Sequence, residues 1–289
     1  MHVLETLQVE LGPPPGLQVR SYALTGLVRG RAVGMGQKEA EAGVTAALSL
    51  EGVGGAVCNE RSFAVEALKL AGNGDVSASA GAGADASAAV GWTLSPRDGA
   101  FVSGSAFDWA KYKPPAAFRP LPLRARVLLS TSRAGPGAQA RVRVEVEMNP
   151  AFAGVGGLEV RVLLTPLCLL SQVCNYDITA CVAGSGGHVH ALNREALTLA
   201  WSVSVPRPAS ARVAVEAVLT LALRGAAADA PTPEVAFPPS LPLKISAAFP
   251  FLLSPAVVRA WLPGREGAET SLEGGAKADF FFAPAAPTD

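Results

Sequence analysis

The sequence predicts an all-β protein built from antiparallel sheets, and three observations support this class. Apolar and polar residues alternate in residues 141–148 (RVRVEVEM) and 212–224 (RVAVEAVLTLALR), as they do in strands with one buried and one solvated face. Gly, Pro, Ser and Asn separate such segments at the spacing typical of a β-sandwich. Apolar residues make up 49% of the 289 residues, which is enough for one large domain or two ordinary ones.

Ten segments are expected to form strands. In chain order they are residues 17–28, 44–51, 62–70, 121–130, 141–148, 158–165, 174–182, 196–204, 212–224 and 241–253. The buried face of 141–148 should consist of Val142, Val144, Val146 and Met148. Residues 61–71 (RSFAVEALKLA) also contain good helix formers, so a short helix is the alternative there. The neighbouring strands favour β.

The chain is expected to contain two β units and one inserted loop. Residues 71–91 are small, polar and low in complexity, which predicts a flexible loop. The Pro-rich stretches 114–122 and 231–242 bracket the middle of the chain, and proline favours sheet edges and crossovers. We therefore predict an elongated two-subdomain antiparallel β-sandwich, with subdomain B (123–239) inserted into subdomain A (1–122 and 240–289). A tandem of two domains is the alternative.

The composition argues against several classes of partner and compartment. Lys plus Arg equals Asp plus Glu at 24 each, so no net field attracts nucleic acid or anionic lipid. The N-terminus lacks the pattern of a signal peptide, and no apolar run reaches the roughly 20 residues that span a bilayer. Cys58, Cys168, Cys174 and Cys181 form no CxxC pair, which favours reduced thiols. The sequence predicts a soluble, non-secreted protein.

No enzyme motif is present, and we expect no catalytic, metal-binding or cofactor-binding residue. The GVGG sequences at 52–55 and 154–157 open no amphipathic helix, so turns or bulges are expected there. Cys58, Asp98 and His188 contain the residue types of a nucleophile, an orienting acid and a base, but their spacing and context do not support a triad. His188 and His190 follow glycines and fit a solvated turn better than a metal site.

Aromatic residues predict where the core lies. Trp92, Phe101, Phe107, Trp109 and Tyr112 gather around one predicted turn, and a buried cluster is the simplest interpretation, with a peptide-binding groove as the alternative. Trp201 should face the core. Phe280, Phe281 and Phe282 are consecutive, which predicts a final strand packed on both sides. An exposed partner site is the alternative for these three.

Residues 92–101 (WTLSPRDGAF) predict strand, turn and strand, because Pro96 presets φ and Asp98-Gly99 favours a tight turn. They resemble the Pro-Pro-Asp-Gly-Glu-Phe turn of the mu homology domain of vesicle-coat adaptors, with Arg97 and Ala100 as departures. Further resemblances follow in the family's order. They are VLETLQVEL (3–11), LQVRSYALTGLVRGR (17–31), VCNERSFAVEALKLAG (57–72), LEVRVLLTP (158–166), HALNREALTLAWSV (190–203) and PLKISAAFPFLLS (242–254).

The resemblance implies an elongated all-β fold of two subdomains and a non-enzymatic role in selecting membrane cargo or binding adaptor partners. Family members that hold tyrosine-based signals use an Asp on the first strand and a Trp-x-Arg on a late strand, and bind the signal by strand addition. Here the first position falls near His2, and the second falls in 268–275, which contains neither Trp nor Arg. The resemblance therefore implies no tyrosine-signal pocket, and the cargo-binding residues stay unassigned.

Among subfamilies, residues 277–287 and 178–203 look most like the medium subunit of the fifth adaptor complex, and muniscin-type endocytic proteins are second. This implies a role in endosomal transport, with other adaptor subunits and the cytosolic tails of cargo as partners. The expected location is cytoplasmic, peripheral on late endosomal or lysosomal membranes. The family's N-terminal longin-like half has no counterpart here, so we expect a fragment, a truncated chain or a stand-alone domain. A β-sandwich adhesion or structural domain is the alternative.

Overall fold

The chain divides into two compact units. The computed structural model describes residues 1–12, 18–31, 45–68, 89–97, 106–134, 137–152, 157–164, 166, 176–184, 190–203, 212–223, 240–261 and 273–284. Unit 1 comprises Met1–Leu7, Ala23–Pro120 and Pro250–Lys277, and unit 2 comprises Gln8–Tyr22, Leu121–Phe249 and Ala278–Asp289. The subdomain boundaries expected from the prolines stay a prediction.

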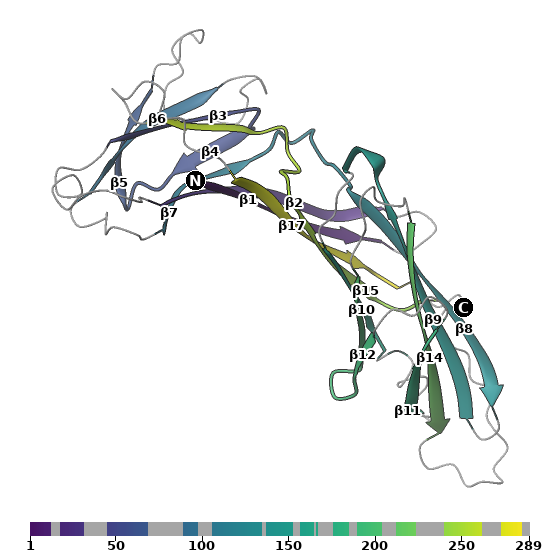
Figure 1. Cartoon of the computed structure of the whole chain (residues 1–289). Coiled ribbons are helices and arrows are strands. Elements are labelled where there is room, and N and C mark those ends of the chain that lie inside the picture. The colour runs from purple at the N-terminus through teal and green to yellow at the C-terminus, as the bar shows by residue number, and fades with distance from the viewer. Residues whose placement is uncertain are drawn as a thin grey trace. The chain divides into compact units, whose positions relative to one another are not determined.

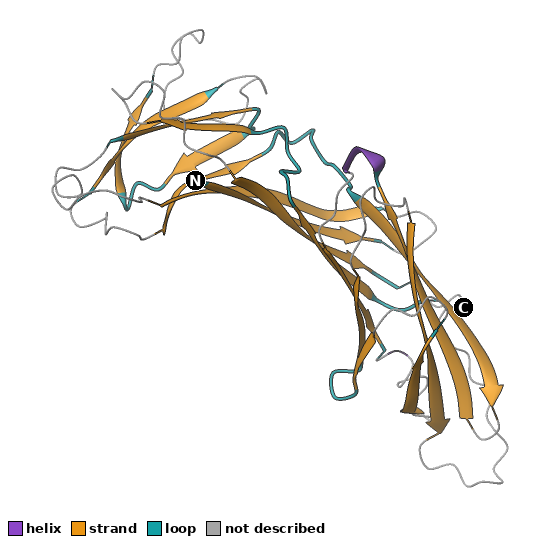
Figure 2. Ribbon diagram, in the orientation of Figure 1, coloured by secondary structure: helices purple, strands orange, loops and turns teal. Residues whose placement is uncertain are grey.

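The described residues consist mainly of strands, which confirms the all-β prediction (Figures 1 and 2). The strands are β1 (His2–Leu11), β2 (Val19–Arg31), β3 (Ala46–Glu51), β4 (Gly55–Cys58), β5 (Phe63–Ala67), β6 (Val90–Pro96), β7 (Ala106–Lys113), β8 (Leu123–Ala134), β9 (Gly137–Met148), β10 (Gly157–Leu163), β11 (Tyr176–Ala183), β12 (His190–Asn193), β13 (Thr198–Val203), β14 (Arg212–Leu223), β15 (Leu243–Phe249), β16 (Val257–Trp261) and β17 (Glu273–Phe282). A 3-10 turn, η1 (Pro150–Phe152), follows β9.

These strands form three sheets. Sheet A has the order β12-β13-β10-β15-β17-β1-β2-β7-β4, sheet B has the order β16-β3-β6-β5, and sheet C has the order β11-β14-β9-β8. Pairing is antiparallel in the described ladders of sheets B and C. The last strand runs parallel to the first, because Glu273 N–H donates to the Met1 carbonyl (3.1 Å) and Ala283 N–H donates to the Leu11 carbonyl (3.0 Å).

Each of the ten predicted strands overlaps a strand of the structure. The helix alternative at 61–71 is wrong for its described part, because residues 63–67 form β5 and pair with β6. Of the predicted loop 71–91, residues 71–88 lie outside the described residues. Its predicted end is wrong, since β6 already begins at Val90.

The core of unit 1 contains most of the predicted aromatic cluster. Trp92, Trp109 and Tyr112 are buried, and Phe107 packs against the core. The rings of Trp109 and Phe63 meet edge to face, with centroids 6.3 Å apart, a favourable aromatic geometry. Phe101 and the predicted turn at 98–101 lie outside the described residues. The buried-cluster interpretation is confirmed for the four described aromatic residues.

Two glycines of β2 make room for aromatic rings of β7. Gly26 is the register partner of Tyr112, and a Cβ built on Gly26 would lie 2.0 Å from Tyr112 Cζ. A Cβ on Gly30 would likewise lie 2.2 Å from Trp109 Cε2. Both rings therefore cover a strand that lacks side chains at these positions, and a larger residue would displace them.

Glu5 is a buried carboxylate that joins three segments of unit 1. Its side chain accepts hydrogen bonds from the Tyr112 hydroxyl (2.8 Å), from the N–H groups of Leu253 (2.5 Å) and Ser254 (3.0 Å), and from the Ser254 hydroxyl. Glu5 is only 1% exposed. A buried carboxylate is tolerated when donors satisfy both oxygens, so Glu5 fixes the segment that precedes β16.

The core of unit 2 agrees with the sequence pattern in β9 and β13. The predicted inward residues Val142, Val144, Val146 and Met148 are at most 3% exposed, and Trp201 is 1% exposed. The outward residues of β9 are arginines and glutamates that form ion pairs with the neighbouring strands. The predicted alternation of buried apolar residues with outward charged residues in β9 is therefore confirmed for each of these positions.

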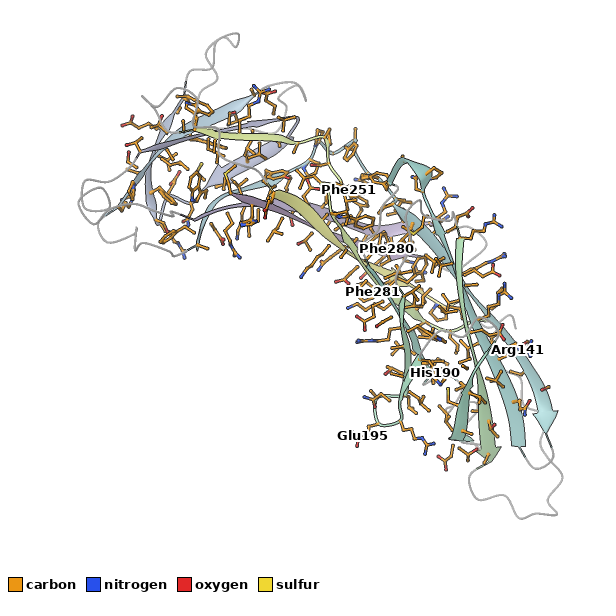
Figure 3. The ribbon with its side chains drawn as sticks, viewed as in Figure 1. Arg141, His190, Glu195, Phe251, Phe280 and Phe281 are labelled. Atoms are coloured by element: carbon orange, nitrogen blue, oxygen red, sulfur yellow. The ribbon has the colours of Figure 1, made fainter. Side chains whose placement is uncertain are left out.

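The final strand corrects one prediction. Phe280 and Phe282 of β17 are buried, but Phe281 is 41% exposed, and Figure 3 shows Phe280 and Phe281 on the same strand. Packing on both sides is therefore wrong for Phe281, because successive strand residues point to opposite faces and only one face is covered. Lys244 Nζ lies 5.1 Å from the Phe281 ring centroid, a cation–π contact that partly shields the exposed ring.

Candidate functional site: open edges of the sheets

The described residues contain no recognisable reaction centre. No group of three or more His, Cys, Asp or Glu side chains among them could hold a metal ion. Burial, with the nearby Glu60 charge second, raises the pKa of Cys58 to about 12, so this thiol stays protonated at neutral pH and is a poor nucleophile. Asp98 and His188, considered with it as a triad, lie outside the described residues.

The remaining histidine of the pair considered for a metal lies on a strand. His190 begins β12 opposite Trp201 of β13, and residues 185–189 before it lie outside the described residues. Burial raises the pKa of Cys181 on β11, which again favours an inert thiol. Among the described residues, no helix is long and apolar enough to cross a membrane.

The two positions that the resemblance connects with tyrosine signals adjoin in unit 1. His2 Nδ1 of β1 lies 3.1 Å from Glu273 Oε2 of β17, and both side chains are more than half exposed. Residues 268–272 lie outside the described residues. The described part of this region thus presents the exposed His2 imidazole and the Glu273 carboxylate, and neither provides an aromatic surface against which a tyrosine ring could stack.

Sheet edges are places where a fold of this kind can bind an extended chain. An edge strand has backbone N–H and C=O groups that no neighbouring strand pairs, and extended peptides can add there. The orders of the three sheets place β12 and β4 at the ends of sheet A, β16 and β5 at the ends of sheet B, and β11 and β8 at the ends of sheet C. These strands differ in length and in what blocks them.

The edge at β5 is blocked near its start by Arg97. Arg97 Nε donates to the Phe63 carbonyl (3.1 Å), which faces away from β6, whereas Arg97 N–H donates to the Ser62 carbonyl (3.1 Å) and continues the ladder between β5 and β6. Asn59 Nδ2 fixes the preceding turn through Ser62 Oγ (3.2 Å) and the Asp108 carbonyl (2.8 Å). Arg97 replaces a proline of the related motif, and the structure gives it a hydrogen-bonding role that the sequence did not reveal.

The edges at β11 and β12 are shortened or interrupted. The β11 ladder skips Thr179 at a bulge, and Arg194 Nη2 donates to the Thr179 carbonyl (3.0 Å). β12 has only four residues. Bulges, charged side chains and short strands are common ways to block an edge, so this side of unit 2 is a poor place for an added strand.

The edge at β16 is short but chemically suited to an extended ligand. Its residues alternate, with Val258 and Ala260 buried and Val257 45% exposed. Arg259 lies on the exposed face, with Nη1 4.0 Å from Glu51 Oε1. An added strand would therefore meet an apolar residue and an arginine on one face of sheet B.

The edge at β8 is longer, with twelve residues. Strand β8 pairs with β9 along its whole length, from Leu123 opposite Met148 to Ala134 opposite Gly137. Nothing in the sequence distinguished β8 from the interior strands, because an edge depends on which strands meet in space.

Comparisons with known proteins identify the fold. No protein-family model matches the sequence, and no curated protein matches it. Among solved structures, the mu homology domain of zebrafish (Danio rerio) Fcho1 with a bound Eps15 peptide is similar at a TM-score of 0.54 and 12% identity, covering 98% of this chain and 93% of that one. The mu homology domain of yeast delta-COP-I aligns at a TM-score of 0.45 and 12% identity, covering 98% and 96%.

The class defined by the structure is therefore an all-β protein whose fold is similar to that of the mu homology domain. At 12% identity the similarity concerns the fold alone. The resemblance inferred from residues 92–101 and the ordered strand motifs is confirmed at this level. The assignment to one adaptor subfamily stays a prediction.

Proposed function

We propose that this chain is a non-enzymatic recognition module of a vesicle coat, which binds extended segments from the cytosolic tails of membrane cargo or from neighbouring coat subunits. The observation that carries the proposal is the fold similarity to the Fcho1 mu homology domain, whose structure contains a bound peptide. The alignment with that structure covers 98% of this chain. The raised pKa of the Cys58 thiol argues only against Cys58 as a nucleophile.

Within unit 1, we assign peptide binding to the outer edge of β16. The edge of β5 is blocked by Arg97, and β4 has only four residues. Strand β16 ends sheet B and presents Val257 and Arg259 on its exposed face. Main-chain hydrogen bonds to this edge would supply affinity, and an apolar or acidic side chain of the ligand would supply specificity.

The finer proposal is that the module serves a complex like the fifth adaptor complex on late endosomal or lysosomal membranes. Its support is the sequence resemblance of residues 277–287 and 178–203. Under this proposal other adaptor subunits are stable partners, and membrane association is peripheral and indirect. Nucleic acid is not an expected ligand under this proposal, because a formal net charge of zero provides no overall attraction.

Affinity capture of the tagged full chain from cells tests the function. We expect coat subunits and membrane cargo to be recovered. We expect Val257→Asp to lose peptide-dependent partners, because it replaces an apolar contact by a charge that repels an acidic ligand. The matched control is Val57→Asp on β4, whose side chain is 69% exposed. Recovery of secretory-pathway partners with no coat subunits would overturn the proposal.

A second test concerns tyrosine-based signals. His2 and Glu273 stand where the related domains would hold the signal, so a tyrosine-motif peptide should bind no better than its Tyr-to-Ala version in calorimetry. A clear preference for the tyrosine peptide would contradict this expectation.

A further inference from the structure

Strand β8 of unit 2 has an outer edge that no other described strand covers. Sheet C ends at β8, and β9 is its one neighbour in that sheet. The strand is twelve residues long, about twice the length of an average strand. An edge of this length can pair with an extended segment of several residues.

The ladder reveals which backbone groups of β8 face outward. Asn149 N–H donates to the Pro122 carbonyl (2.9 Å), and this pair continues the register of β8 with β9. In an antiparallel ladder, hydrogen-bonded and non-hydrogen-bonded pairs alternate. Leu123, Ala125, Val127 and Leu129 therefore direct their N–H and C=O groups away from β9, and no described residue bonds to these groups.

The side chains of β8 divide between two faces. Leu123, Ala125 and Val127 are buried on the inner face, whereas Arg124 and Arg126 are exposed on the outer face, followed by Leu128, which is 42% exposed. Because a strand added to β8 would follow the same pleat, every second residue of that strand would lie beside the arginines. The intervening residues would lie beside the inner, apolar positions.

The outer face at this edge is positively charged. It contains Arg124, Arg126, Arg141, Arg143 and Arg212 against Glu145, Glu147 and Glu216. All three glutamates are already engaged. Glu145 lies 2.6 Å from Arg126 and 3.0 Å from Arg143, Glu147 lies 3.3 Å from Arg212, and Glu216 lies 3.6 Å from Arg141. Arg124 forms no ion pair with a described carboxylate, and β8 itself contains no acidic residue.

This charge pattern discriminates between two occupants of the edge. A second copy of the chain paired through β8 would bring the arginines of both copies together, and like charges in one sheet are unfavourable. A segment with acidic side chains at alternate positions would instead place carboxylates beside Arg124 and Arg126. Charge-assisted hydrogen bonds of this kind are stronger than neutral ones.

We propose that the outer edge of β8 binds an extended peptide segment with acidic side chains at alternating positions, which adds to sheet C as a further strand. The proposal depends on the geometry and charge of β8. It does not depend on the vesicle-coat function or on the β16 edge, so either can fail without the other.

Fluorescence anisotropy of the full chain tests the proposal with a labelled, blocked peptide of sequence TVEVEVT as the probe. We expect saturable binding that weakens as salt increases, and no binding of the lysine version TVKVKVT. Arg124→Glu should weaken binding at least about tenfold, since it replaces an attraction by a repulsion. The matched control is Arg161→Glu on β10, a strand paired on both sides whose Arg161 side chain is 48% exposed, and it should leave the affinity unchanged.

Backbone addition is tested separately. Ala125→Pro removes an outward N–H without removing a ladder hydrogen bond, a position where an edge strand tolerates proline, and it should also weaken binding about tenfold. Hydrogen exchange should show new protection of residues 123–131 with the probe. The proposal would be overturned by absent binding, by exchange protection confined to strands other than β8, by insensitivity to both Arg124→Glu and Ala125→Pro in variants with native circular dichroism, or by dimerisation through β8 in sedimentation.

Discussion

Replacing Glu5 by alanine should destabilise unit 1 strongly, whereas replacing Glu10, the exposed glutamate of the same strand, should not. Glu5 is 1% exposed, and its two oxygens accept from Tyr112, Leu253 and Ser254. Alanine would remove the acceptor and leave these donors inside the protein. The cost arises because buried donors that lose their partner have already given up their hydrogen bonds to water.

The magnitude follows from the number of donors that stay buried. The bonds from Tyr112 and Leu253 are buried, whereas those from Ser254 are only partly buried, so Ser254 can turn to water. Two unsatisfied buried donors at about 1–3 kcal/mol each give a loss of about 2–6 kcal/mol. This is a large fraction of the roughly 5–15 kcal/mol that stabilises a domain. Glu5→Gln keeps one acceptor oxygen and should cost less.

Urea denaturation followed by tryptophan fluorescence measures this loss, because Trp92 and Trp109 lie in the core of unit 1. Glu10→Ala, an exposed position of β1, is the matched control and should change stability by less than about 0.5 kcal/mol. A Glu5→Ala variant that loses less than about 1 kcal/mol would refute the reasoning, since it would mean that water replaces the carboxylate without cost.

Three other predictions concern the same unit. Burial and, second, the Glu5 charge raise the pKa of Tyr112 above its ordinary value of 10.0. Because the phenol ionises at a lower pH in the unfolded chain than in the folded one, the free energy of unfolding is unaffected by this group below the ordinary pKa and falls as the pH rises above it. Tyr112→Phe should flatten this fall in urea titrations. Gly26→Ala should cost about 1–3 kcal/mol by displacing the Tyr112 ring, whereas Gly55→Ala, with no atom within 4 Å of its Cβ, should not. Cys58 should react with a thiol reagent at neutral pH only after unfolding.

The strands could be predicted from the sequence because their signal is local. In β9 the alternation of valine with arginine and glutamate gives both the strand and its buried face, and Val142 and Val144 are fully buried as expected. Phe281 shows where this reasoning ends. Its sequence neighbours indicate burial, but its exposure depends on whether a second layer covers that face, and no local pattern contains this information.

The candidate sites were much less predictable, because they depend on which strand ends a sheet. Strands β8 and β9 both show alternating patterns, yet one is an edge and the other is interior. Arg97 was visible only as a departure from a familiar turn, and the structure shows it hydrogen-bonded to the Phe63 carbonyl. Glu5 gave no signal, since an acidic residue on an alternating strand normally faces water.

The arginines at the sheet edges differ in what they bind. Arg97 donates to a backbone carbonyl of β5, and Arg194 donates to one at the bulge of β11. The guanidinium groups of these two arginines therefore bind carbonyls at the protein's own sheet edges. Arg124 on β8 makes no ion pair with a described carboxylate, and its strand offers unpaired backbone groups beside it. Charged side chains can also serve to prevent strand pairing at an exposed edge. An edge protected in this way would show no new exchange protection of residues 123–131 with the acidic peptide, so the exchange measurement separates a protected edge from a binding edge.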